Sequence, residues 1–167
     1  MTEVTEKADA SAIDPSTAEV EALLATADPV PVVSIFDFYD TDINEEEEGR
    51  WFENIIPGAS FKLRRFTAKA VNNERNRLQL AFRKYANKDG SFPENISTRI
   101  VNEQMGVIIA DWRGDALVDR DGSPLVYSPE KAKALAAQLP NLRTQLLLIS
   151  MDMASYRTTD RKEIEGN

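Results

Sequence analysis

Hydrophobic positions in the second half of the chain recur at helical spacing. After Pro140, apolar side chains step by four, three, four and three residues, which predicts a strongly amphipathic helix. An earlier stretch follows a possible capping box at Ser91–Glu94 and carries one broad apolar face. We expect it to be the central helix, closed by Gly114, with Trp112 in the core. The two stripes comprise Leu142, Leu146, Ile149, Met153 and Tyr156, and Ile96, Ile100, Val101, Met105, Ile108, Ile109 and Trp112.

Two further helices are predicted on either side of the central one. A stripe at helical spacing, formed by Val71, Leu78, Phe82 and Tyr85, predicts a basic helix over residues 67–88. Ser128-Pro129 has the residue types that cap and begin a helix, and Pro140 stops it. The sequence therefore predicts about four main helices.

Other segments alternate or carry turn residues, as short strands do. We expect one strand at 32–39, which is β-branched and aromatic, and another at 60–66, which alternates with period two and would pair with the first. Residues 40–49 are interpreted as an acidic loop, and Pro57-Gly58 as a turn. Residues 117–127 predict a short hairpin with a two-residue Asp121-Gly122 turn. The predicted fold class is α+β, predominantly α-helical, with one or two small β-hairpins.

The ends of the chain differ in composition from its middle. Residues 1–29 predict an acidic, mostly disordered arm, with a possible short amphipathic helix from Ser16 to about Ala27. We expect a single globular α+β domain over residues 30–157 and a polar disordered tail over 158–167. Residues 1–12 lack an apolar core, so no export signal is expected.

Charge is distributed unevenly along the chain. Residues 1–60 hold fifteen acidic and two basic residues, whereas residues 61–113 hold eleven basic and five acidic ones, within a net charge of −8. That net charge disfavours non-specific binding to nucleic acid or to an anionic membrane. Cysteine and histidine are both absent, which removes thiolate chemistry, the commonest general base and the commonest metal ligand.

Two motifs that could carry chemistry have simpler interpretations. Asp40–Asn44 begins like a calcium loop, but its sixth and twelfth positions are Glu45 and Trp51 instead of glycine and glutamate, so a solvated acidic loop is favoured. Ser128–Lys131 matches a serine-x-x-lysine pair without its companion elements, and a helix cap explains it. We therefore expect no enzyme activity, and no catalytic, cofactor-binding or metal-binding residues.

The basic residues from Lys62 to Lys88 allow three interpretations. Nine of them accumulate with only Glu74 opposing them. They could form a solvated helix face, dock onto an acidic partner or the chain's own acidic arm, or contact nucleic acid, which the net charge disfavours. Trp51 follows the acidic loop and could be an interface anchor or simply half-exposed.

Residues 51–157 contain a series of motifs in a characteristic order. Trp51-Phe52 is followed by the run from Pro57 to Arg65 and a basic helix. Residues 110–114 then lead through an Asp–Gly turn to the serine–proline–glutamate cap at residues 128–130. This order resembles that of the tail assembly chaperones of long-tailed, siphovirus-type bacteriophages.

This resemblance implies a protein of the host cell cytoplasm that binds the tape measure protein, keeps it soluble and recruits tail tube protein. A structural subunit retained in the virion tail or neck is the alternative. We expect no nucleic acid or membrane partner, and self-association is possible. The hypothesis places the client or self-association surface on the basic helix, strand 60–66 and Trp51. Its candidate partner-binding residues are Trp51, Arg64, Arg65, Lys69 and Arg77.

Overall fold

The computed structural model describes residues 34–158, all of which belong to one compact unit. This part is α+β and mostly helical, which confirms the predicted fold class, with four helices of ten residues or more. The predicted arm, its short helix and residues 159–167 of the predicted tail lie outside the described residues, and the predicted domain boundaries stay predictions. The elements are α2 (Ile35–Tyr39), α3 (Ile43–Glu48), β1 (Arg50–Ile56), β2 (Ala59–Leu63), α4 (Lys69–Phe82), η1 (Arg83–Tyr85), α5 (Glu94–Ile108), β3 (Ile109–Arg113), α6 (Pro129–Gln138), α7 (Pro140–Met151) and η2 (Ala154–Tyr156).

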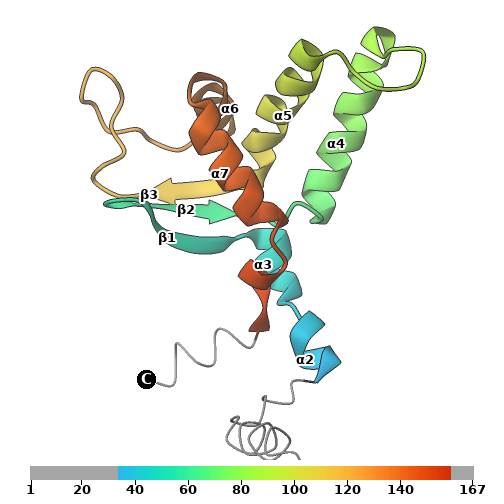
Figure 1. The fold of residues 1–167 in the computed structure, drawn as a ribbon. Coiled ribbons are helices and arrows are strands. Elements are labelled where there is room, and N and C mark those ends of the chain that lie inside the picture. The colour runs from blue at the N-terminus through green and yellow to red at the C-terminus, as the bar shows by residue number, and fades with distance from the viewer. Residues whose placement is uncertain (1–33, 159–167) are drawn as a thin grey trace, which may run out of the picture. The chain divides into compact units, whose positions relative to one another are not determined.

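Strands β1, β2 and β3 form an antiparallel sheet in that order, and α5, α6 and α7 lie on one side of it (Figure 1). The register places Phe52, Phe61 and Trp112 in one row across the sheet, toward the core. Because side chains alternate along a strand, the neighbouring row of Trp51, Lys62 and Asp111 belongs to the opposite face. The sheet thus has one apolar and one polar face.

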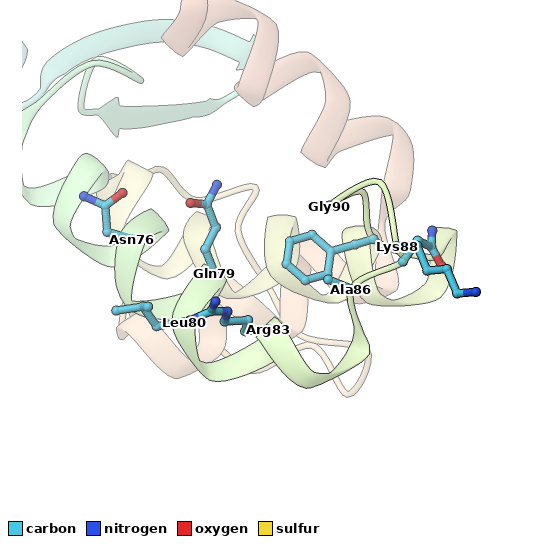
Figure 2. A pocket seen from close by; sticks show the side chains of 9 residues that line it. Asn76, Gln79, Leu80, Arg83, Ala86, Lys88 and Gly90 are labelled. Carbon is cyan, nitrogen blue, oxygen red and sulfur yellow. The ribbon is translucent and has the colours of Figure 1, made fainter.

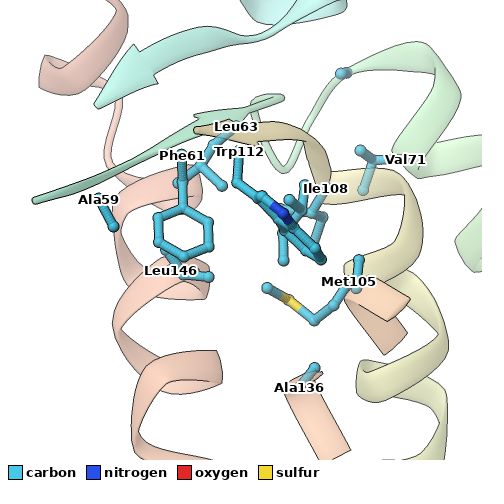
Figure 3. Close-up of a cluster of buried hydrophobic side chains, with 12 residues drawn as sticks. Ala59, Phe61, Leu63, Val71, Met105, Ile108, Trp112, Ala136 and Leu146 are labelled. Carbon is cyan, nitrogen blue, oxygen red and sulfur yellow. The ribbon is translucent and has the colours of Figure 1, made fainter. Parts of the chain in front are cut away.

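The core lies between this sheet and the helices (Figure 3). Phe61, Leu63, Met105, Ile108 and Leu146 are almost completely buried, and the Phe61 and Trp112 rings meet edge to face with centroids 6.2 Å apart. Each such side chain stabilises the fold by about 1.5–3 kcal/mol. Met105, Ile108 and Leu146 of the predicted stripes thus reach the core from helices, as expected, whereas Ile109 and Trp112 reach it from β3. Tyr85, predicted in the stripe of the basic helix, is 47% exposed.

Residues 34–39, expected in a strand, form helix α2 instead. Ser34 caps it, since its Oγ accepts a hydrogen bond from the Phe36 N–H at 3.3 Å. The predicted partner strand is β2, which pairs with β1 and β3 and has no free edge for another strand. The strand prediction and the pairing prediction were therefore wrong.

The acidic loop expected over 40–49 contains helix α3. Asp42 Oδ1 accepts hydrogen bonds from the backbone N–H groups of Asn44 and Glu45 at 2.9 and 3.1 Å, which is the geometry of an N-cap. Gly49 ends the helix at a φ of +98°, with the Leu63 carbonyl 3.2 Å from where a Cβ would lie. The loop prediction was wrong, because four consecutive glutamates are stabilised as a helix by contacts distant in sequence.

The central helix is shorter than its apolar stripe. Helix α5 ends at Ile108, and the chain continues as β3, so Trp112 is buried from a strand and not from a helix. Arg64 explains the end, because its backbone N–H donates to the Ile108 carbonyl at 2.8 Å and its Nη1 donates to the Val107 carbonyl at 2.7 Å. Gly114 follows a strand, and a Cβ there would lie 2.1 Å from the Gly58 carbonyl oxygen.

Most of the predicted turns and helix caps are confirmed, and one is wrong. Ser128 caps α6, with its Oγ accepting from the Lys131 N–H at 3.1 Å, and Pro140 separates α6 from α7, both as predicted. Pro57-Gly58 joins β1 to β2, as predicted. The expected capping box at Ser91 is absent, because Ser91 Oγ donates to Asp89 instead and Pro93 takes the cap position.

The hairpin expected over 117–127 is present with a longer turn. The Asp119 carbonyl accepts from the Gly122 N–H at 2.9 Å and the Asp119 N–H donates to the Ser123 carbonyl at 2.8 Å. The loop therefore has three residues rather than two, with Gly122 at a φ of +83°.

Candidate partner-binding surface

Part of the predicted basic surface is held against the chain's own acidic helix α3. We define the base as α3 together with residues 64–69. There the Arg65 guanidinium pairs with the Glu46 carboxylate, and only 19% and 14% of the two side chains are exposed. Next to the base, Arg50 lies 3.7 Å from Glu45. Of the three interpretations of the basic run, docking onto acidic residues of the same chain describes this part, and within residues 34–158 the acidic element is α3.

Arg64, a candidate binding residue, is occupied within the fold. Besides its bonds to the end of α5, its Nε donates to the Glu47 carbonyl oxygen at 3.0 Å. Arg64 thereby ties α3, β2 and α5 together. Its geometry and that of Arg65 favour structural roles.

Lys69 and Arg77 lie on α4 and differ from the two arginines of the base. The Lys69 backbone N–H, at the start of α4, donates to both Glu47 carboxylate oxygens at 2.8 and 3.0 Å, so a glutamate from α3 caps this helix. The Lys69 residue is exposed. Arg77 is also exposed and forms two 2.7 Å hydrogen bonds with Glu74, which lower the pKa of Glu74 below its ordinary value.

Trp51 lies in the polar row of the sheet, on β1. The Arg113 guanidinium carbon lies 4.1 Å from the centroid of its ring, and Arg113 also pairs with Glu53. Hydrogen bonds from Ser60 and then from Arg113 hold the pKa of Glu53 below its ordinary value. Trp51 is half-buried under the Arg113 cation. It pairs with Lys62 across the sheet, whereas the Arg64 and Arg65 side chains are bonded to α3.

Helix α2 and the start of α3 carry an exposed apolar surface that was not predicted from the sequence. Ile35, Phe36 and Tyr39 of α2 and Ile43 at the start of α3 are 66%, 82%, 60% and 73% exposed, and we call them the α2 patch. A hollow beside it is lined by the three α2 residues and Asp40. The signal was in the sequence, since positions 35, 36, 39 and 43 have helical spacing, but the β-branched and aromatic composition favoured a strand.

The far end of the α4–α5 hairpin carries a second open feature. We call residues 79–92 the tip. A groove of about 760 Å³ there is lined by Leu80 and Phe92 and by cationic and polar side chains. Figure 2 shows Leu80 and Arg83 on one wall and Lys88 and Gly90 on the loop that leads to α5. Leu80 is 70% exposed.

Neither feature offers the elements of a metal site. Within residues 34–158 no group of three or more carboxylate, histidine or cysteine residues could hold a metal ion. In the same range, no helix combines the length and the apolar character needed to cross a membrane.

A family model described as YdaY prophage protein matches residues 66–167, more than half of the chain. The chain belongs to the YdaY prophage protein family. No curated protein and no solved structure matches it. Membership of the YdaY family makes the chain phage-derived. The matched region begins at Phe66 and contains the tip, whereas the α2 patch and strands β1 and β2 precede it.

Proposed function

We propose that this YdaY family member is a phage tail assembly chaperone that acts by binding protein and not by catalysis. In this proposal it binds the tape measure protein in the host cytoplasm, keeps it soluble and promotes assembly of tail tube protein around it. The phage origin and the order of motifs over residues 51–157 support this function. The observation that carries it is the α2 patch.

The α2 patch has the properties of a client-binding surface. Large contiguous apolar side chains on a soluble protein mark interaction sites, and an amphipathic client helix offers a matching apolar stripe. A tape measure protein is a long helical client, which many copies of a small patch could cover. Modest contacts of this kind release quickly, as is needed for a chaperone that tube subunits displace.

Residues 156–158 hold α2 in place and leave the patch exposed. The Arg157 guanidinium carbon lies 3.8 Å from the centroid of the Phe38 ring, and the Asp42 N–H donates to the Tyr156 carbonyl at 3.0 Å. Thr158 Oγ1 donates to Asp40 at 3.1 Å. These contacts order α2 before the client binds, which lowers the entropic cost of binding.

Co-expression with a tape measure protein tests the proposal. The chain is expected to keep the tape measure protein soluble. Phe36→Asp should weaken binding roughly tenfold, since it removes an aromatic side chain that the client buries in the complex and adds a charge there. The measurement is the soluble fraction of tape measure protein, followed by co-purification. Leu148→Asp is the matched control, because Leu148 is 62% exposed on α7, outside the patch.

Two results would count against the proposal. A tape measure protein that stays insoluble with the unaltered chain contradicts chaperone function, and equal losses for Phe36→Asp and Leu148→Asp contradict the α2 patch as the binding surface. Mass spectrometry of purified virions addresses the alternative role as a tail or neck subunit. The chaperone proposal predicts that the protein is absent from mature particles.

A further inference from the structure

The tip holds cations that the fold leaves without carboxylate partners. Arg83, Lys84 and Lys88 form no ion pair with any residue in the range 34–158, and Lys84 lies 5.0 Å from the centroid of the Tyr85 ring. Arg99, on the adjoining turns of α5, packs against the Phe82 ring at 5.2 Å. Residues 83–99 contain these four bases and two acids, Asp89 and Glu94, so this end of the hairpin has a charge of +2.

The two acids at this end of the hairpin, Asp89 and Glu94, do not form ion pairs with these bases within residues 34–158. Asp89 accepts hydrogen bonds from the Ser91 N–H and Oγ at 3.0 and 2.7 Å, so its carboxylate is directed to its own loop. Glu94 begins α5, where a carboxylate is stabilised by the helix dipole. The groove beside them combines exposed Leu80 and half-buried Phe92 with Arg83 and Lys88. Such a groove fits an amphipathic helix that has an apolar stripe and acidic flanks.

The chain itself contains a segment of that chemistry. Residues 1–33 hold seven acids and one base. Within them, residues 16–28 have no basic residue, and Val20, Leu23, Leu24 and Ala27 recur at helical spacing beside Glu19 and Glu21. We propose that the tip groove binds the acidic segment 16–28 of a second copy of this chain.

The second copy is favoured over the same copy by reach. Only five residues, 29–33, join Asp28 to Ser34, so the Cα atoms of these two residues can lie at most about 20 Å apart in an extended chain. Helix α4, with its 14 residues, is itself about 21 Å long, and the tip lies at its far end. In Figure 1, α2 and the tip lie at opposite ends of the described part. An arm from a neighbouring copy has no such restriction.

The geometry of this contact determines the kind of assembly. The arm of one copy and the groove of the next are different surfaces, so the contact is head to tail and can repeat without closing. Repetition gives an open chain of copies, which suits a protein that lines a long client. The inference concerns the protein alone and goes beyond the proposed function, so it can fail while client binding stands.

Disulfide trapping tests the contact directly, because the chain has no cysteine of its own. A full-length Leu23→Cys chain and a differently tagged Leu80→Cys chain are mixed in a glutathione redox buffer. The expected result is a covalent heterodimer that forms at least about tenfold faster than with Leu148→Cys, since the local concentration in a docked arm far exceeds that in solution. Leu148 is exposed to a similar extent as Leu80.

The double variant Leu23→Cys/Leu80→Cys distinguishes the remaining outcomes. Linked dimers and longer species support exchange between copies, whereas a purely intramolecular disulfide overturns it. Equal rates with Leu80→Cys and Leu148→Cys also overturn the inference and leave the groove to another acidic partner.

Charge reversal provides a second, independent measurement. Lys84→Glu/Lys88→Glu should raise the dissociation constant for self-association about tenfold in sedimentation experiments, since exposed ion pairs each contribute modestly. Mixing this variant with Glu19→Lys/Glu21→Lys should restore association. Failure of the mixture to associate more tightly than either variant alone contradicts the proposed contact.

Discussion

The base and the tip are both rich in arginine and lysine, yet the fold uses them in opposite ways. At the base, the helix of glutamates neutralises Arg65, receives Arg64 and caps α4 through Glu47. At the tip, Arg83, Lys84 and Lys88 have no ion pair within residues 34–158, beside a groove with exposed Leu80. A continuous basic run in the sequence thus divides into a part that stabilises the fold and a part that is available to partners.

The largest expected difference in stability is between a charge reversal at the base and one at the tip. Arg65→Glu should lower the free energy of unfolding by about 2–4 kcal/mol, because it places a second carboxylate against the mostly buried Glu46. Lys84→Glu at the tip should change it by less than about 0.5 kcal/mol, as exposed surface substitutions do. Urea denaturation of both variants measures the difference.

Equal stabilities for these two variants would remove the distinction between the base and the tip. A combined Arg65→Glu/Glu46→Arg variant is the matched control. It should recover part of the loss if the pairing of opposite charges is what matters.

A smaller effect is expected at Tyr156, which is completely buried beside the base. Its hydroxyl donates to the Leu63 carbonyl at 3.1 Å, and burial raises its pKa above the ordinary value. Tyr156→Phe leaves that carbonyl without its donor and should cost about 1–2 kcal/mol near pH 7.

The same residue predicts the alkaline limit of stability. Because the pKa is raised in the folded state, Tyr156 contributes its full stability below the ordinary tyrosine pKa of about 10, and this contribution is lost as the pH rises above that value. Between pH 8 and 11, the free energy of unfolding measured by urea denaturation should therefore fall less steeply for Tyr156→Phe than for the unaltered chain. An equal pH dependence of the free energy of unfolding for both chains would show that the folded protein does not disfavour ionised Tyr156.

Local signals in the sequence were sufficient for much of this fold. Ser128 and Pro140 bound α6 and separate it from α7, and the apolar stripes identified the helices that supply the core. Cap and stop residues act within a few positions of their own, so they can be recognised without knowing the tertiary structure.

Errors occurred where distant contacts decide the local structure. The stripe through Ile108 to Trp112 continues at helical spacing, but bonds from Arg64 end the helix and pairing with β2 makes a strand. Four consecutive glutamates read as a loop, because their partners Arg65 and the start of α4 are about twenty residues away. The bonds that hold Arg64 and Arg65 to α3 and the stacking of Arg113 on Trp51 are likewise contacts that the local sequence does not show.

The sequence indicated the type of candidate site, a protein-binding surface, better than it indicated which residues form that surface. Absence of histidine and cysteine directed attention to protein binding, and the excess of basic residues pointed to the helix predicted over residues 67–88, whose end lies in the tip. Which cations stay unpaired depends on where α3 docks, and that is a tertiary property. The α2 patch was missed because its composition favours a strand, whereas the strand β2 had no free edge to receive it.

Hydrogen exchange of the full chain, alone and in complex with tape measure protein, tests the account most directly. We predict that amides of α2 gain protection in the complex, whereas those of residues 64–66 stay as they are. The latter already donate to the Ile108, Glu46 and Ser150 carbonyls at 2.8, 3.1 and 2.8 Å. Unchanged exchange in α2, together with altered exchange at residues 64–66, would contradict the account and make the base the binding surface.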